Sequence, residues 1–254
     1  MATNIKKTSF ILFILRLLKM SVTIITVTFT AKFFGVSMER DMWVMALTVV
    51  STITMAVWGP LNEIFRTKFV FVKESEGEYV AIEKTASLVG FVFVSTLILS
   101  LSILCLSPFL ADAMVINGTN EARHIFMLLL VLQIPTLLIS ELTNIGISIL
   151  NAYEIYYVPE IVSFVSGCVN LLAIIVFAPV IGIYSLLIAT YFGALLLFFL
   201  LLHFLRIKRI FIWSRLIRFK WSDAKIFLLF SLPFFFPYFV GQMNGFFEKY
   251  LGLV

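Results

Sequence analysis

The chain has 254 residues, of which 61% are hydrophobic and only 13% are charged, and its formal net charge is +5. A single water-soluble domain of this composition could not cover its surface with polar groups, so that class is excluded. The two cysteines fall inside apolar runs and the two histidines are solitary in sequence, so neither type predicts a disulfide framework or a metal site. The composition therefore predicts a protein that folds in a lipid bilayer.

Seven apolar runs, taken in chain order, predict an all-α polytopic transmembrane bundle. Each run is at least about as long as the roughly 20 residues that a helix needs to cross the hydrocarbon core. Strands of a membrane barrel would alternate apolar and polar side chains, whereas these runs are apolar on every side. The runs cover residues 9–34, 42–72, 87–110, 125–150, 158–179 and 181–205, and a seventh begins near residue 226 and reaches residue 250.

The distribution of lysine and arginine predicts a cytoplasmic N-terminus. Most cations lie near residues 6–7, 66–84 and 206–225, whereas the loops that would face the other side hold Arg40 and Arg123. The same pattern argues against a nucleic-acid partner, because the cations flank membrane spans and do not form one soluble face.

The segment 207–225 divides the chain into two parts. It interleaves basic and aromatic residues, which fits either an amphipathic helix in the cytoplasmic interface or a basic loop with aromatic anchors. We therefore expect a lobe of six helices over residues 1–206, a basic amphipathic connector over 207–225, and the first helix of a second lobe over 226–254.

Two cations lie inside the first apolar run. Arg16 and Lys19 are three residues apart on one helical face, so both could reach the oxygens of one pyrophosphate group. A charge at the bilayer centre costs about 2.5–3.5 kcal/mol on insertion scales, so such residues normally face a bundle interior or a watery cavity. Alternatively, both side chains could extend to the cytoplasmic head groups from a position near the helix end.

Polar residues in the second run are candidates for a gate. Asn62, Glu63 and Arg66 follow the pair Gly59-Pro60, where the proline removes a backbone donor and bends the helix. Glu63 and Arg66 are three residues apart, so they could equally neutralise each other as a structural pair.

The fourth run carries Glu141 and Asn144, three residues apart. Glu141 is the best single candidate for a proton- or cation-coupling group, because burial favours the protonated form of a carboxylate. The alternative is a structural carboxylate satisfied by a cation from the first or second helix. Further along, Asn151 and Glu160 are interpreted as residues that stabilise helix ends, since an acid in the first turn of a helix complements its dipole.

Three passages carry a resemblance to a known family. They are residues 31–41 with the charged segment 73–78, residues 149–159 with Asn170 and the pair 178–179, and residues 221–224 with Pro233 and Gln242. They resemble the MviN/MurJ family of lipid II flippases, within the multidrug/oligosaccharidyl-lipid/polysaccharide exporter superfamily. Members of that family have two helical lobes. The resemblance implies an N-terminal lobe plus the first helix of a second, in a chain that is truncated or one part of a split protein.

The resemblance implies a transporter and not an enzyme. The implied activity is the movement of a lipid-linked saccharide, such as lipid II or a polysaccharide repeat unit, across the cytoplasmic (inner) membrane by alternating access. The implied partners are the polyprenyl pyrophosphate lipid, membrane lipids, and a second half-transporter chain or C-terminal lobe. No cofactor and no catalytic residue is expected, because the sequence has neither a GxxxxGK[ST] loop nor an assembled Ser/His/Asp set.

The same resemblance implies roles for particular residues. Lys32 falls on a basic position of the family's motif, whereas Arg16 and Lys19 lie close to its arginine positions but out of register; together with their own spacing, this makes all three the candidates for contact with phosphate. Capping of the second helix would explain Asp41 without a function, and the resemblance raises it to a gating or coupling residue. Where the family carries arginines in its first two helices, this chain has Met20, Thr26 and Thr54, which leaves the saccharide open. Two other functions stay open: export of small cationic or amphipathic compounds, and a non-transporting membrane scaffold or fragment.

Overall fold

The computed structural model describes residues 5–115, 118–210 and 219–251, and within them the secondary structure is entirely helical. Each of its seven helices is long and apolar enough to cross a bilayer, so the prediction of an all-α polytopic bundle is confirmed. The chain is therefore a multi-pass membrane protein. The helices are α1 (Ile5–Phe34), α2 (Met38–Glu76), α3 (Glu78–Met114), α4 (Asn120–Ala152), α5 (Tyr157–Ile181), α6 (Tyr184–Ile207) and α7 (Trp221–Leu251).

Two of the helices are much longer than the bilayer is thick. At 1.5 Å per residue, the 39 residues of α2 span about 58 Å, roughly twice the 30 Å hydrocarbon core. Gly77 alone separates α2 from α3, and its φ of +96° is a backbone conformation that a residue with a side chain rarely adopts. The charged C-terminal end of α2 and N-terminal end of α3 therefore extend beyond the bilayer as one helical hairpin.

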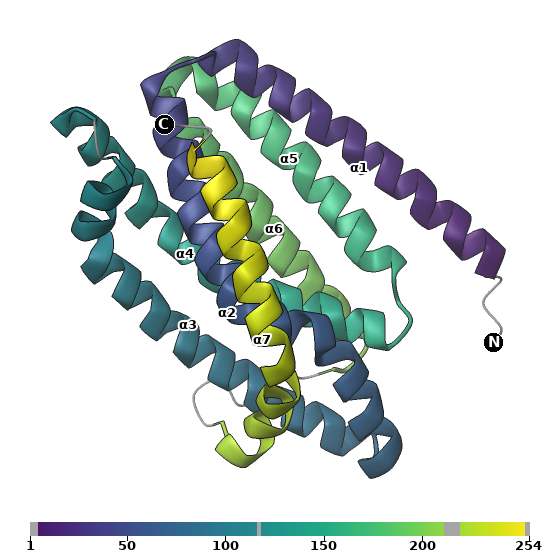
Figure 1. Ribbon diagram of the computed structural model, residues 1–254. Helices are drawn as coiled ribbons and strands as arrows, with labels where there is room; N and C mark the ends of the chain where they lie inside the picture. Colours follow the sequence, from purple (N-terminus) through teal and green to yellow (C-terminus); the bar gives the residue numbers. More distant parts are fainter. Residues whose placement is uncertain (1–4, 116–117, 211–218, 252–254) are drawn as a thin grey trace.

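The bundle has a centre and an edge (Figure 1). Helix α2 contacts α3, α4 and α7, and α4 also contacts α3 and α6. Helix α5 packs on α6 and, at the edge of the bundle, α1 runs alongside α5. None of the most apolar stretch of α1 is buried, so α1 is held to the rest of the lobe mainly through α5.

Two separate apolar cores fill the bundle, one near each end. We call the end at which α2, α4 and α6 finish and α3, α5 and α7 begin the basic end. The core at the basic end includes Phe65, Phe69 and Phe227, all fully buried, with Phe65 stacked on Phe227 at 5.4 Å between ring centroids. The core at the opposite end includes Phe126 and Leu129 of α4 and Trp43, Ala46 and Val49 of α2. Helix α1 supplies to these cores only the partly buried Phe34, which packs against the core at the opposite end, among the described residues.

The connector between α6 and α7 differs from the prediction at its edges. Helix α7 begins at Trp221, before the apolar run that was expected to open it near residue 226. Ser87 of α3 holds this start: its hydroxyl donates to Asp223 Oδ2 at 3.3 Å and accepts the Lys220 N–H at 3.4 Å. Residues 211–218, on which the amphipathic interpretation of the connector rests, lie outside the described residues.

Candidate functional site

A polar cavity opens at the basic end, between α1 and the start of α5. Its volume is about 400 Å³. Helix α1 supplies Arg16 and Lys19, α2 supplies Arg66, α4 supplies Asn151, and the start of α5 supplies the opposite wall. The complete lining is Leu12, Arg16, Lys19, Arg66, Ile147, Asn151, Tyr156, Pro159, Glu160 and Ser163.

The charge of the cavity is positive. Among its described lining residues, Arg16, Lys19 and Arg66 are cations and Glu160 is the carboxylate. The guanidinium of Arg66 meets a neutral partner, since it donates to the Tyr156 hydroxyl at 2.5 Å and lies 5.1 Å from the centroid of the same ring. The cavity can therefore accept an anion with at least two negative charges without first losing a buried ion pair.

The contact of Arg16 with Glu160 is an exchangeable one. Arg16 Nε donates to Glu160 Oε1 at 3.2 Å, but the Arg16 side chain is 70% exposed. Exposed ion pairs of this kind contribute about 0–1 kcal/mol, so an incoming phosphate could displace the carboxylate at small cost. Glu160 lies in the first turn of α5, as expected for an acid that complements the helix dipole, and it also forms this ion pair.

Lys32 does not belong to this cavity. It lies in the last turn of α1, sixteen residues beyond Arg16, which corresponds to about 24 Å along the helix axis. Its Nζ lies 5.9 Å from the Phe29 ring centroid. The structure thus brings together two of the three predicted phosphate contacts and separates the third.

Asp41 also lies at the opposite end of the bundle. It occupies the first turn of α2, where a negative charge complements the helix dipole. The capping residue is Ser37, whose hydroxyl accepts the Arg40 N–H at 3.3 Å. The interpretation of Asp41 as the cap is therefore wrong by one helical turn, because Ser37 is the residue with extended backbone just before the helix.

A buried carboxylate lies between α2 and α4. Glu141 is 2% exposed. Its Oε2 accepts the Asn62 side-chain amide at 3.2 Å, and its Oε1 accepts the Asn144 amide at 3.5 Å. The contact with the second helix that the sequence suggested is present, but the partner is an amide and carries no charge. Three of the six residues predicted for gating or coupling, Asn62, Glu141 and Asn144, form one cluster.

Glu63 and Arg66 contact different partners. Glu63 Oε2 accepts the Tyr238 hydroxyl of α7 at 3.1 Å, whereas Arg66 turns to Tyr156 in the polar cavity. Tyr238 also lies directly over Gly59, where an added Cβ would come within 2.6 Å of its ring. The residues after Gly59-Pro60 therefore hold α7 on one side and line the cavity on the other.

Sequence reasoning did not select Tyr156, Asn151, Glu160 or Ser163 as lining residues of a site. All four lie near the junction of α4 and α5, and for Asn151 and Glu160 the sequence favoured a role at the helix ends. The helical spacing of Glu160 and Ser163, three residues apart, was the available signal that both share one face of α5. The identity of the facing helix, α1, could not be read from that spacing.

The seven long apolar helices of the described residues define a polytopic membrane protein. The chain is similar in structure to the lipid II flippase MurJ in an inward closed conformation, with a TM-score of 0.71 and 19% sequence identity. The match covers 96% of this chain and 50% of that chain, so this chain spans half the length of the flippase.

At this level of identity the likeness shows the fold. The chain has the fold of half of a MurJ-type protein, which confirms the architecture that the three resembling passages imply. No protein-family profile and no curated protein matches the sequence.

Proposed function

We propose that this chain is one lobe of a flippase that moves a lipid-linked saccharide from the cytoplasmic to the outer leaflet of the cytoplasmic membrane. The observation that carries the proposal is the cationic cavity at the basic end of a MurJ-type fold. The positive-inside rule assigns the basic end to the cytoplasm, where the lipid-linked saccharide is made available. A cavity with a net positive charge suits a pyrophosphate head group and disfavours a cationic drug.

In this proposal Arg16, Lys19 and Arg66 hold the pyrophosphate while the lipid chain stays in the bilayer. Guanidinium and ammonium groups form charge-assisted hydrogen bonds to phosphate oxygens, and these are about twice as strong as neutral hydrogen bonds. Lys32, at the other end of α1, is assigned to a later contact on the outer side. Asp41, at the same end, is assigned to the outer gate.

The coupling role belongs to Glu141 with Asn62 and Asn144. A carboxylate between two amides can take up a proton or a monovalent cation and release it when α2 and α4 separate. Asn62 and Arg66 are one turn apart on α2, so a change at the carboxylate reaches the cavity through the same helix.

The proposed organisation follows the sequence prediction. We assign residues 1–206 to the first lobe and residues 207–225 to the connector, whose last five residues already belong to α7 (Trp221–Leu251), and we assign α7 to the opening of a second lobe. A second lobe, in the same or another polypeptide, completes the central cavity for alternating access.

The test is a leaflet-accessibility assay for a lipid-linked saccharide precursor in cells depleted of this protein. The wild type should restore appearance of the precursor in the outer leaflet. The triple variant of Arg16, Lys19 and Arg66 to glutamine should leave the precursor inside. If the precursor still reaches the outer leaflet after depletion, the flippase proposal is wrong for that precursor.

A further inference from the structure

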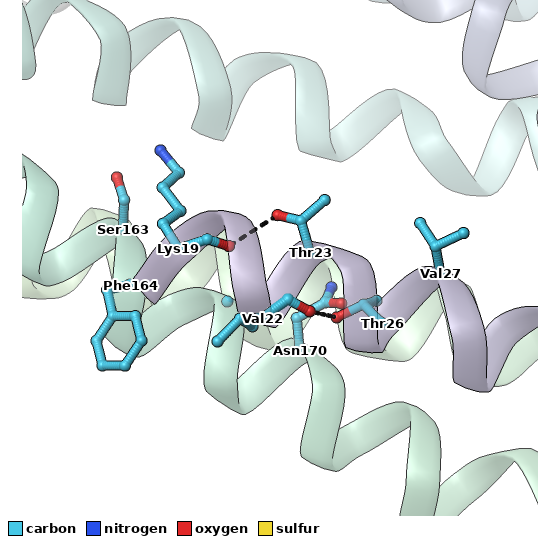
Figure 2. A pocket seen from close by; sticks show the side chains of 9 residues that line it. Lys19, Val22, Thr23, Thr26, Val27, Ser163, Phe164 and Asn170 are labelled. Carbon is cyan, nitrogen blue, oxygen red and sulfur yellow. Dashed lines mark hydrogen bonds between the residues drawn. The ribbon is translucent and has the colours of Figure 1, made fainter. Parts of the chain in front are cut away.

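A narrow fissure continues from the polar cavity along the seam of α1 and α5 (Figure 2). Its volume is about 260 Å³. Lys19 and Ser163 line both spaces, so the fissure and the cavity meet at these two residues. The remaining walls are Val22, Thr23, Thr26 and Val27 from α1 and Phe164, Gly167 and Asn170 from α5.

The walls of the fissure are more apolar than its composition suggests. The hydroxyl of Thr23 donates to the Lys19 carbonyl at 3.0 Å, and that of Thr26 donates to the Val22 carbonyl at 2.8 Å (Figure 2). Both threonines satisfy their hydroxyls within α1, so their methyl groups are available to an apolar ligand. A Cβ added at Gly167 would lie in ordinary van der Waals contact with Val22 Cγ1, at 3.5 Å, so a side chain larger than that of alanine at this position would enter the seam between α1 and α5.

The fissure extends from the polar cavity along the α1 axis, toward the midpoint of the bundle's length. From Lys19 to Val27 it follows α1 for about 12 Å, away from the basic end. A lipid of the cytoplasmic leaflet has the same order of parts: a charged head at the interface and a chain directed to the midplane. The cations and the apolar fissure therefore match one amphiphile in a single orientation.

We propose that the fissure between α1 and α5 holds the first isoprene units of a polyprenyl pyrophosphate whose head occupies the polar cavity. This inference rests on the proposed function and adds the position of the lipid chain within the lobe. A fissure of this volume suits one chain, whereas a phospholipid carries two. The cavity cations Arg16, Lys19 and Arg66 also suit a diphosphate better than the single phosphate of a phospholipid.

The test uses the full chain in lipid nanodiscs with two probes, inorganic pyrophosphate and farnesyl pyrophosphate. Gly167→Leu fills the fissure from α5, and Val27→Phe fills it from α1, where the native side chain is 58% exposed and can be enlarged without disturbing a core. Val176→Phe is the matched control, because Val176 is 60% exposed on α5 and does not line the fissure.

Both fissure variants should bind farnesyl pyrophosphate at least about tenfold more weakly than the wild type does, which corresponds to 1.4 kcal/mol. Their affinity for inorganic pyrophosphate should stay within about twofold, since the head-group site is untouched. Val176→Phe should match the wild type with both probes. Unchanged binding of farnesyl pyrophosphate by both fissure variants would overturn the proposal for the chain.

Two further outcomes separate this inference from the proposed function. If the wild type does not bind inorganic pyrophosphate, the head-group site fails and the flippase proposal fails with it. A photoreactive farnesyl pyrophosphate should label peptides that contain residues 22–27 or 164–170. Labelling confined to other helices, or displacement of the probe by phosphatidylglycerol at equal concentration, would overturn the proposal that the fissure holds the lipid chain. Neither result would contradict the head-group site in the polar cavity.

Discussion

Replacement of Glu141 separates a coupling role from a structural one. The carboxylate is 2% exposed and accepts the Asn62 amide at 3.2 Å. Glu141→Gln keeps the shape and one amide oxygen as an acceptor, so Asn62 can remain satisfied. Glu141→Leu removes the acceptor and strands the Asn62 amide between α2 and α4. The two variants therefore differ in hydrogen bonding, while both remove the ionisable group.

The expected magnitudes follow from these contacts. A stranded donor costs about 1–3 kcal/mol, which is the expected loss of unfolding free energy for Glu141→Leu. The Asn144 contact, at 3.5 Å, is at the limit of a hydrogen bond and should add little. Glu141→Gln should unfold within about 1 kcal/mol of the wild type, because the glutamine oxygen still accepts the Asn62 amide. Denaturant unfolding in mixed micelles measures both.

The transport activity of Glu141→Gln distinguishes a coupling role of Glu141 from a structural one. If Glu141 couples ion uptake to transport, Glu141→Gln should fold like the wild type and yet fail in the leaflet-accessibility assay. A structural carboxylate predicts the opposite, with normal transport by Glu141→Gln and a deficit in Glu141→Leu that follows its stability. Wild-type transport by Glu141→Gln would refute the coupling role.

Three further predictions concern the cavity, the core and the basic end. Single substitutions of Arg16, Lys19 or Arg66 by glutamine should each weaken pyrophosphate binding about tenfold or more in calorimetry, because one charge-assisted contact of about 1.5–3 kcal/mol is lost. Lys32→Gln, about 24 Å away along α1, should leave this affinity unchanged. An equal loss of affinity in Lys32→Gln would contradict the proposal that the cavity is the head-group site. Phe227→Ala should lower the unfolding free energy by about 3–5 kcal/mol, since the buried Phe227 ring stacks on Phe65. Phe236→Ala, at a position that is 76% exposed, should change the unfolding free energy by less than about 0.5 kcal/mol. Equal losses in the two variants would show that α7 is not held through Phe227. Burial, with the hydrogen bond to Glu78, raises the pKa of Tyr153 above its ordinary value of about 10. Neutral Tyr153 therefore stabilises the fold below about pH 10, and this contribution is lost as the pH rises further. Tyr153→Phe should reduce the fall of Tm above about pH 10, and an unchanged fall would exclude Tyr153 as its cause.

Most of the fold could be predicted from apolar runs, because in a bilayer every backbone polar group must be satisfied within its own helix. What the runs could not predict is where helices end in water. The run 42–72 is the apolar part of α2, but the helix itself covers Met38–Glu76, since Ser37 caps its start and Gly77 ends it. Likewise α7 begins at Trp221, before the apolar run, because Ser87 forms hydrogen bonds with Asp223 and Lys220 at the start of the helix.

The site was predictable within a helix and not between helices. The spacing of Arg16 and Lys19 placed both on one face of α1, and both line the cavity. Lys32 was included by resemblance of a motif, whereas its distance along α1 excludes it from the same cavity. Tyr156 gave no signal in the sequence, because its role as a partner of Arg66 depends on how the junction of α4 and α5 meets α2.

The turn of α2 that follows Pro60 contacts several other helices of the bundle. Within five residues, Asn62 contacts Glu141 on α4, Glu63 contacts Tyr238 on α7, and Arg66 contacts Tyr156 beside α5. The proline removes one hydrogen bond of the helical ladder just before them, which makes this the part of α2 that can bend at least cost. A displacement of α7 would act on Glu63, and the same turn carries Arg66 in the cavity and Asn62 at the buried carboxylate. Bending at Pro60 can therefore move Arg66 and Asn62 in a single movement, which is what the proposed alternating access would need.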